Sequence, residues 1–423
     1  MWRRTALSLG RRQLQGGPRG HANQVPPASF RMSHKRPARR ILGVEKNIWL
    51  EFTEMAAKYK SVDLGQGFPN FSPPDFVRQA FSDVVSGEDC LMHQYTRAFG
   101  HPTLVKILAK LYGQLLGQSI DPFGDILVTV GAYEALFTAF QALVDEGDEV
   151  IIIEPFFDCY EPMVKMAGGH CVFVPLRPKG TPDKPALSSG EWALDPDELA
   201  SKFTERTKAI VLNTPHNPLG KVFKREELQV IAELCVKHDV LCISDEVYEW
   251  IVFDGNEHIK IASLPGMWAQ TVTIGSAGKT FSATGWKEAV ARGFQRELDV
   301  LGRPESYLFQ LPRQLQEKRN RLVECLLSVG MRPIIPEGGY FLIVDISALN
   351  VELPEPADEE EPYDYRFAKW LIKTKGMATI PVSAFYSLGH RKDFASYIRL
   401  CYVKEDSTLE AAEKILKEWH LTK

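Results

Sequence analysis

Short apolar runs alternate with segments of helical periodicity between residues 68 and 286, and this alternation limits the fold more than any other feature of the sequence. The runs expected to form strands are Asp125–Val130, Val150–Ile153, Lys208–Asn213, Val240–Ser244 and Thr271–Ile274. Helices are expected to begin near Ala132, with Leu136, Phe140 and Leu143 at helical spacing, and to contain Leu228, Ile231 and Leu234. Apolar strands separated by amphipathic helices predict an α/β fold with a mostly parallel sheet between helices.

The rest of the chain has a different pattern, which predicts a second, smaller α+β domain. Helical stretches are expected around residues 290 to 328 and 363 to 375, and strands at Tyr340–Asp345 and Tyr397–Val403. A chain of 423 residues with 44% hydrophobic content is long enough for two such domains. We expect residues 68–286 to form the large domain, and residues 41–67 and 287–423 to form the small one. The acidic run Pro354–Pro362 is expected to be an exposed loop.

The first forty residues are rich in arginine and contain no Asp or Glu, since the first acidic residue is Glu45. Such a composition is typical of a mitochondrial transit peptide, so residues 1–40 predict import into the mitochondrial matrix. A disordered basic arm is the alternative interpretation. Met32 could also start a shorter, cytosolic product.

Composition makes several other classes of protein improbable. A formal net charge of -4 gives no reason to expect a nucleic-acid partner. Seven cysteines without a C-x-x-C pair indicate neither a disulfide framework nor a zinc site. No apolar run approaches the ~20 residues that a transmembrane helix requires, so no membrane span is expected.

Glycine and polar side chains follow several of the expected strands, at the edge where parallel sheets gather functional groups. Gly131 and Ala132 could hold a phosphate with the free N–H groups of a helix start, although a glycine there is usually only a turn. Asn217, within the sequence NTPHNPLG, could point its amide inward or belong to a plain turn. Asp245 and Tyr248 follow the next strand, where an aspartate is most often a helix N-cap.

Lys279 lies in the small-residue sequence GSAGKTFSATGWK that follows the last of these strands. A phosphate-binding P-loop would require glycine five positions before Gly278, but Thr273 stands there. A single lysine is usually solvated, because an unpaired buried ammonium is costly. Together with the aromatic pair Phe156-Phe157 and the groups described above, however, Lys279 fits pyridoxal 5'-phosphate (PLP). That cofactor needs a lysine, a carboxylate, hydrogen-bond donors, a stacking aromatic ring and a phosphate cup.

Four motifs carry a resemblance that covers the chain from about residue 40 to its end, with one break. They are LGQGFP (64–69), EPFFDCY (154–160), NTPHNPLG (213–220) and SDEVY (244–248). With them the chain resembles class I PLP-dependent aminotransferases of the aspartate aminotransferase-like fold. It looks most like the kynurenine aminotransferase/cysteine-S-conjugate β-lyase group, and within that group like the mitochondrial third member.

The resemblance implies a role for each of several residues toward the cofactor. Lys279 would be the Schiff-base lysine and the general base, and Asp245 would hold the pyridine nitrogen protonated. Asn217 and Tyr248 would hydrogen-bond the phenolic oxygen, and Phe157 would stack on the ring. The residues implied around the phosphate are Gly131, Ala132, Ser276 and Lys287, with Tyr133 nearby and Tyr95 contributed by the neighbouring subunit of a homodimer.

The resemblance also implies the substrates and the residues that bind them. Arg399 would hold the α-carboxylate in a two-pronged contact, with Asn217 alongside; Gly67 would add a backbone contact, and Trp49 would border the side-chain pocket. The implied reaction transfers the amino group of kynurenine and other large neutral or aromatic amino acids to 2-oxo acids. Cysteine S-conjugates, which carry a leaving group on Cβ, would instead undergo β-elimination.

The sequence departs from the family pattern directly after Lys287. In the family a strand and a helix follow at this point, and Glu288–Phe294 resembles only the last part of that segment. The rest of the strand and helix, on the order of 25 residues, is therefore expected to be missing. In the family fold that strand lies inside the sheet, between the strands expected at Asp125–Val130 and Thr271–Ile274. Its loss predicts unpaired backbone groups on both neighbours, at ~1 to 3 kcal/mol each when buried.

Three hypotheses about function therefore stay open at this stage. The first is an active transaminase and β-lyase. The second is a poorly folded or inactive variant that pairs with the intact enzyme without catalysis. The third is a nucleotide hydrolase, which requires that Lys279 works without pyridoxal.

Overall fold

A computed structural model describes residues 38–41, 48–89, 92, 94–179, 185–283, 290–349, 351–355 and 361–421. The residues from Arg39 to Lys423 belong to one compact unit. Residues 1–37 of the expected transit segment, Met32 among them, lie outside the described residues, and so does Lys287. The expected domain boundaries stay a prediction.

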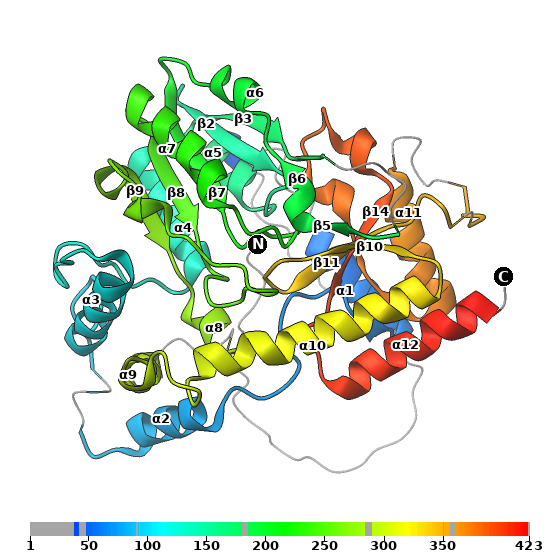
Figure 1. Cartoon of the computed structure of the whole chain (residues 1–423), viewed down its shortest axis with the longest axis horizontal. Helices are drawn as coiled ribbons and strands as arrows, with labels where there is room; N and C mark the ends of the chain where they lie inside the picture. Colours follow the sequence, from blue (N-terminus) through cyan, green and yellow to red (C-terminus); the bar gives the residue numbers. More distant parts are fainter. Residues whose placement is uncertain are drawn as a thin grey trace, which may run out of the picture. The chain divides into compact units, whose positions relative to one another are not determined.

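Five parallel strands form the large sheet, in the order β3-β2-β7-β8-β9 (Figure 1). Their bounds are Glu149–Glu154 (β2), His170–Pro175 (β3), Thr207–Asn213 (β7), Leu241–Asp245 (β8) and Thr271–Ile274 (β9). Helices α4 (Ala132–Leu143) and α5 (Tyr160–Ala167) pack on one face, where Phe140 contacts the cluster that contains Val150 and Ile152. Helix α7 (Arg225–His238) packs on the other face, with Ile151 and Ile231 in one cluster. Alternate residues of the strands thus place apolar side chains on both faces of the sheet, and helices cover both faces as the sequence predicts.

Four of the five predicted strands of this sheet are confirmed, but the strand expected at Asp125–Val130 is wrong. These residues form turns and irregular structure, and Leu127 and Val130 are 50% and 59% exposed. Among the described residues β9 ends the sheet, so no strand lies beside it to bind this segment. A strand requires a hydrogen-bonded neighbour, and an apolar sequence without one does not become a strand.

The second sheet also has five strands, in the order β13-β14-β11-β10-β5. Their bounds are Leu187–Ser188 (β5), Arg332–Ile335 (β10), Phe341–Asp345 (β11), Ile380–Pro381 (β13) and Tyr397–Cys401 (β14). Two-stranded pairs are formed by β1 (Val62–Asp63) with β12 (Met377–Ala378), and by β4 (Arg177–Pro178) with β6 (Trp192–Ala193). The strands predicted at Tyr340–Asp345 and Tyr397–Val403 are therefore confirmed as β11 and β14.

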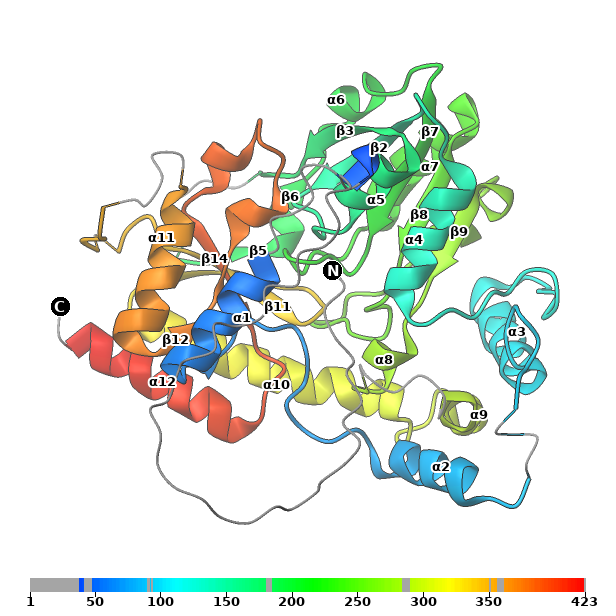
Figure 2. The ribbon, with the colours of Figure 1, turned by 180° about the vertical axis from the view of Figure 1, so that it is seen from behind.

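Helices from both ends of the described chain cover this second sheet. Helices α10 (Tyr307–Ser328) and α12 (Asp406–Leu421) lie side by side, seen from both sides in Figures 1 and 2. The others are α1 (Ile48–Tyr59) and α11 (Tyr363–Trp370), which continues as a π-helix over Leu371–Lys375. Helix α9 (Val290–Val300) precedes α10 and packs instead against α2 (Asp75–Ser86) and α3 (Pro102–Leu116). The helical stretches expected at 290–328 and 363–375 are thereby confirmed, the first divided by a turn that contains Gly302 at φ 81°.

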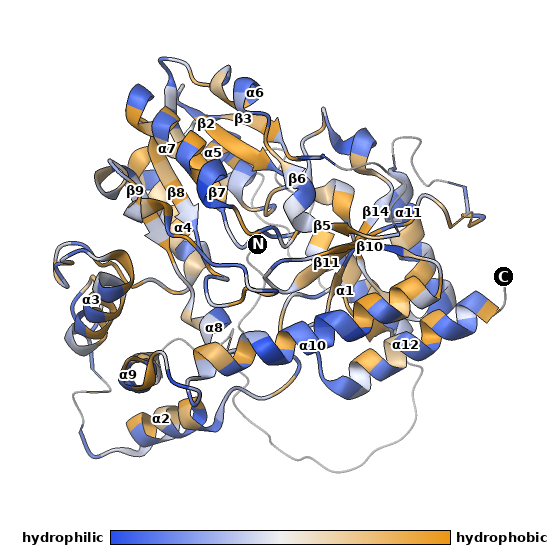
Figure 3. Ribbon diagram, viewed as in Figure 1, coloured by the Kyte–Doolittle hydropathy of each residue, from blue (hydrophilic) through white to orange (hydrophobic). Residues whose placement is uncertain are grey.

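The remaining helices are short or lie near α9. They are α2 (Asp75–Ser86), α3 (Pro102–Leu116), α6 (Pro196–Ala200) and α8 (Ala277–Thr280). Figure 3 shows apolar residues concentrated in the central strands, while α10 and α12 carry both kinds of residue. Among the described helices, none is both long and apolar enough to cross a bilayer. The six cysteines within the described ranges are free thiols.

Candidate active site

The carboxyl ends of β7, β8 and β9 carry the polar groups predicted from the sequence, and the aromatic pair Phe156-Phe157 follows β2. Parallel pairing places Asn213 of β7 beside Asp245 of β8, and Asp245 beside Ile274 of β9. The chain that leaves β9 forms α8, whose N-cap Ser276 accepts a hydrogen bond from the backbone N–H of Lys279. Adjacent strand ends therefore bring residues that are 32 to 66 positions apart to one edge of the sheet.

Lys279 is partly buried beneath aromatic rings. Its Nζ donates a hydrogen bond to the carbonyl of Gly67 at 3.0 Å and lies 5.0 and 5.6 Å from the ring centroids of Tyr340 and Tyr248. Burial disfavours the ammonium, so the pKa of Lys279 falls from 10.5 to about 8. A pKa of about 8 leaves about a tenth of this side chain at pH 7 as the free amine, which is the form that acts as nucleophile or base.

Asp245 is a buried carboxylate, 3% exposed, that faces the same region. One oxygen accepts the hydroxyl hydrogen of Tyr160 at 2.5 Å, and the other accepts a long hydrogen bond from the backbone N–H of Val247 at 3.4 Å. Burial raises the pKa of Asp245 to about 6, against the opposing effect of the Tyr160 hydrogen bond and the charge of Lys279. The carboxylate is ionised at neutral pH, and a new positively charged partner would lower its pKa strongly.

Arg399, on β14 of the second sheet, is 1% exposed. Its guanidinium lies 3.8 Å from the ring centroid of Phe341 and 5.0 Å from those of Trp49 and Phe385. Nη1 donates to Asn217 Oδ1 and Nη2 to the carbonyl of Gly65, both at 3.0 Å. Nε has no hydrogen-bond partner among the described residues. Burial lowers its pKa to about 10, so the group stays charged, and a charged buried donor without a partner indicates an anionic ligand.

The loop from Asn213 to Gly220 is buried throughout and fixes Asn217. The backbone N–H of Asn217 donates to Asn213 Oδ1 at 2.7 Å, while Asn213 Nδ2 donates to the carbonyl of Asp245 at 2.9 Å. Tyr248 is 3% exposed, and burial raises its pKa. The predicted inward amide and the tyrosine are thus both found beside Arg399 or Lys279.

Gly131 begins α4 with φ 85°, a left-handed conformation that favours glycine, and a Cβ built there would meet nothing within 4 Å. The space beside Gly131, at the N-terminus of α4, is therefore open to an anion that helix N–H groups could bind. Ala132 is half-buried and Tyr133 is 60% exposed. The Tyr133 ring stands edge-on to Phe157, with centroids 6.5 Å apart.

Gly67 and Trp49 also lie with these residues. A Cβ on Gly67 would come within 2.5 Å of the Phe341 ring, so only glycine fits at this close approach. Trp49 Nε1 donates to Asp158 Oδ2 at 2.7 Å. Tyr95, by contrast, is fully exposed, and the structure does not bring it to the other site residues.

Three residues that shape the site are not among those predicted from the sequence. Tyr160 bonds Asp245, Asp158 orients Trp49, and the Tyr340 hydroxyl donates to the backbone carbonyl of Lys279 at 3.2 Å. Tyr160 and Asp158 stand directly after the aromatic pair in EPFFDCY, so that motif could have revealed them.

A buried charge cluster lies behind the Lys279 loop. Glu246, Glu249 and His258 have the spacing of metal ligands, but Lys260 Nζ donates to both carboxylates. The Tyr112 hydroxyl donates to Glu249 at 2.5 Å. The ammonium supplies the positive charge that a metal would bring, so both carboxylates are paired without one.

Lys279 and Asp245 at the edge of the parallel sheet, together with Arg399 from the second sheet, define an enzyme that handles amino and carboxylate groups. The family model for aminotransferase class I and II matches residues 59–303 and 287–415. The chain belongs to the class I and II aminotransferases.

Several relatives cover almost the whole chain. Kynurenine–oxoglutarate transaminase 1 of Homo sapiens is 55% identical over 92% of this chain and 99% of that protein. Kynurenine–oxoglutarate transaminase 3 of Bos taurus is 52% identical over 90% of each. Among solved structures, Bna3p of Saccharomyces cerevisiae, described as a candidate kynurenine aminotransferase, has a TM-score of 0.85 at 32% identity, covering 91% of this chain and 99% of that one. A Thermus thermophilus aspartate aminotransferase has a TM-score of 0.73 at 27% identity, over 92% of this chain and 100% of that one, which confirms the predicted fold class.

The comparisons bear on the break expected after Lys287. The two matches to the family model overlap at residues 287–303, where that break was expected. The alignment with the human relative is 419 residues long, yet 92% of 423 residues is only about 389. About 30 aligned positions therefore have no residue in this chain. Both facts agree with a lost segment, whose position stays a prediction.

Proposed function

We propose that this enzyme uses PLP to transfer the amino group of kynurenine, and of other large neutral or aromatic amino acids, to 2-oxo acids. The observation that carries the proposal is a partly buried amine, Lys279, with a pKa of about 8, in one site with the buried Asp245 and Arg399. The names of the relatives, kynurenine–oxoglutarate transaminases 1 and 3, support kynurenine as a substrate.

The residues present fit PLP. The open space at Gly131, the N-cap hydroxyl of Ser276 and the free N–H groups of α4 suit its phosphate. Asp245 offers a buried carboxylate to the pyridine nitrogen, and Phe157 offers a half-buried ring. When bound, the cofactor withdraws electrons from the substrate Cα.

The side chains of the protein supply the remaining chemistry. The free amine of Lys279 would remove the proton from the substrate Cα and deliver it to C4' of the cofactor. A pKa near 8 permits this proton transfer at neutral pH. Arg399 would exchange its bonds to Asn217 and Gly65 for the substrate carboxylate. The rings of Trp49 and Phe341 around the guanidinium would exclude water.

Loss of a Cβ leaving group can follow removal of the same Cα proton. The residues that support transamination would therefore also support β-elimination of cysteine S-conjugates. No additional group is needed, because Lys279 performs the proton transfer in both reactions.

A homodimer and a matrix location form part of the proposal. Full exposure of Tyr95 suits a side chain that reaches the site of a partner subunit. The Arg-rich, acid-free residues 1–40 support import into mitochondria, and a start at Met32 would give a cytosolic form.

Turnover by the purified chain tests the proposal. With added PLP, kynurenine and a 2-oxo acid, the chain should form kynurenic acid, and Lys279→Ala should abolish this activity while Lys414→Ala, an exposed change on α12, preserves it. A soluble dimer that neither binds PLP nor turns over would instead identify a non-catalytic partner of the intact enzyme.

A further inference from the structure

The segment Leu64–Asn70, here called the linker, joins β1 to the residues before α2 and passes directly by the site. Three cationic side chains donate to its carbonyls. Arg399 donates to Gly65 at 3.0 Å, Lys279 to Gly67 at 3.0 Å and Lys404 to Phe68 at 3.1 Å. Two of these cations belong to the proposed catalytic machinery, and the third has no role in it.

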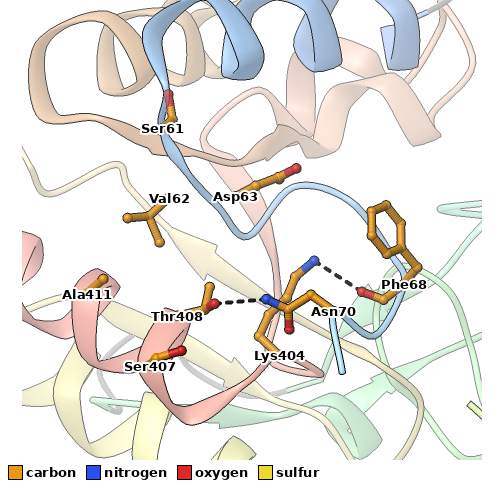
Figure 4. A pocket seen from close by; sticks show the side chains of 9 residues that line it. All are labelled: Ser61, Val62, Asp63, Phe68, Asn70, Lys404, Ser407, Thr408 and Ala411. Atoms are coloured by element: carbon orange, nitrogen blue, oxygen red, sulfur yellow. Dashed lines mark hydrogen bonds between the residues drawn. The ribbon is translucent and has the colours of Figure 1, made fainter. Parts of the chain in front are cut away.

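Lys404 follows β14 and is 2% exposed. Its Nζ donates to the neutral carbonyl of Phe68 and lies 4.7 Å from the Phe68 ring centroid, and Figure 4 shows this bond. A buried ammonium is expensive unless its donors are used, so this contact favours a linker that stays in place.

Asn70 attaches the end of the linker to α12. Its Oδ1 accepts the backbone N–H of Glu405 at 2.6 Å, and its Nδ2 donates to Thr408 Oγ1 at 2.8 Å. The second of these bonds is drawn in Figure 4. Asn70 and Lys404 therefore hold successive parts of the linker from the same side.

A cavity of about 360 Å³ adjoins these contacts. Phe68, Asn70, Lys404 and Thr408 line it, together with Asp63 of β1, directly before the linker. Close packing normally immobilises a segment, but here one side of the linker faces this space. On this side the polar contacts of Lys404 and Asn70 restrain the linker, while Gly67 packs closely against Phe341.

We propose that Lys404 is a positioning residue, which holds the Phe68 carbonyl and thereby keeps the Gly67 and Gly65 carbonyls beside Lys279 and Arg399. The inference rests on the proposed function, in which Lys279 and Arg399 leave these carbonyls when they bind cofactor and substrate. Of the three cations, Lys404 alone then keeps its bond and holds the linker against the bound amino acid.

Replacement of Lys404 by methionine tests this role, because methionine keeps the length of the side chain and removes the donor. We expect the KM for kynurenine to rise about tenfold, the effect of one lost charged hydrogen bond, while kcat changes less than about threefold. Lys404→Arg should partly restore KM, since a guanidinium can also donate to the Phe68 carbonyl. The matched control is Lys414→Met on the exposed face of α12.

Hydrogen exchange of the protein without cofactor supplies a readout that does not need activity. Amides of residues 64–70 should exchange about tenfold faster in Lys404→Met than in Lys414→Met. If Lys404→Met does not fold, Asn70→Ala removes the neighbouring restraint at an exposed position and should give the same linker exchange.

The outcomes separate this inference from the proposed function. Unchanged linker exchange, or a fall in melting temperature without a separate rise in KM, would overturn the positioning role. If the parent chain shows no turnover, the proposed function fails by itself. Linker exchange then decides alone, with faster exchange in Lys404→Met supporting the role and equal exchange refuting it.

Discussion

Lys279 should titrate as an unusually acidic lysine in the protein without cofactor. Burial lowers its pKa from 10.5 to about 8. At pH 7.5 a pKa of about 8 leaves about a quarter of the side chain as free amine, compared with about one part in a thousand for a pKa of 10.5. The populations of the reactive form therefore differ by roughly 200-fold.

Competitive acetylation over a pH series, followed by peptide mass spectrometry, measures this difference. The labelling rate of Lys279 should reach half of its maximum near pH 8, and the exposed Lys414 in the same sample corrects for reagent decay. Asp245→Asn removes a negative charge that favours the ammonium, so the midpoint should move to lower pH. A midpoint near that of an ordinary lysine, or an upward movement in Asp245→Asn, would refute the assignment of Lys279 as a buried base.

Three further predictions concern the substrate arginine, the charge cluster and the sheet edge. Arg399→Lys should raise the KM for the amino acid about 10- to 100-fold with a smaller effect on kcat, because an ammonium cannot match the two-pronged guanidinium contact; steady-state kinetics measure this, and an unchanged KM would contradict it. Burial opposes the ionisation of Glu246, but the charges of Lys260 and His258 outweigh burial and lower the pKa of Glu246 from 4.5 to about 2. The ionised Glu246 therefore stabilises the fold above pH 4.5, and this stabilisation is lost as the pH falls toward 2. Denaturant unfolding at several pH values should show this loss, and Glu246→Gln should flatten it; an equal slope in both proteins would count against the cluster. Amides of β9, at the edge of the described sheet, should exchange faster than those of β7 at its centre, and equal protection would argue that another segment covers β9.

Local pattern was sufficient for most of the elements, because apolar periodicity reports directly which face is buried. Val150–Ile153 and Thr271–Ile274 became strands where the sequence predicts them. Asp125–Val130 has an equally strand-like sequence but lacks a neighbour, and a strand depends on the segment beside it. Its exposed apolar side chains are what the predicted loss of a strand after Lys287 would leave uncovered.

The residues of the site also include some that local pattern predicts and others that it does not. Lys279, Asp245 and Asn217 follow strands, so the rule for parallel sheets brings them to one edge. Tyr160 and Lys404 act through single contacts to Asp245 and Phe68, 85 and 336 positions away along the chain, and no local pattern reports such contacts. Arg399 was assigned only through family resemblance, because an arginine on a strand is otherwise most often solvated.

Reduction of the PLP-loaded protein with borohydride, followed by peptide mapping, identifies the side chain that holds the cofactor. The reagent fixes the cofactor to whichever amine holds it, so one measurement reports folding, cofactor binding and the identity of the lysine. We expect a single labelled peptide that contains Lys279, and no label in Lys279→Ala. Label on other lysines, or none with excess cofactor, would contradict this expectation.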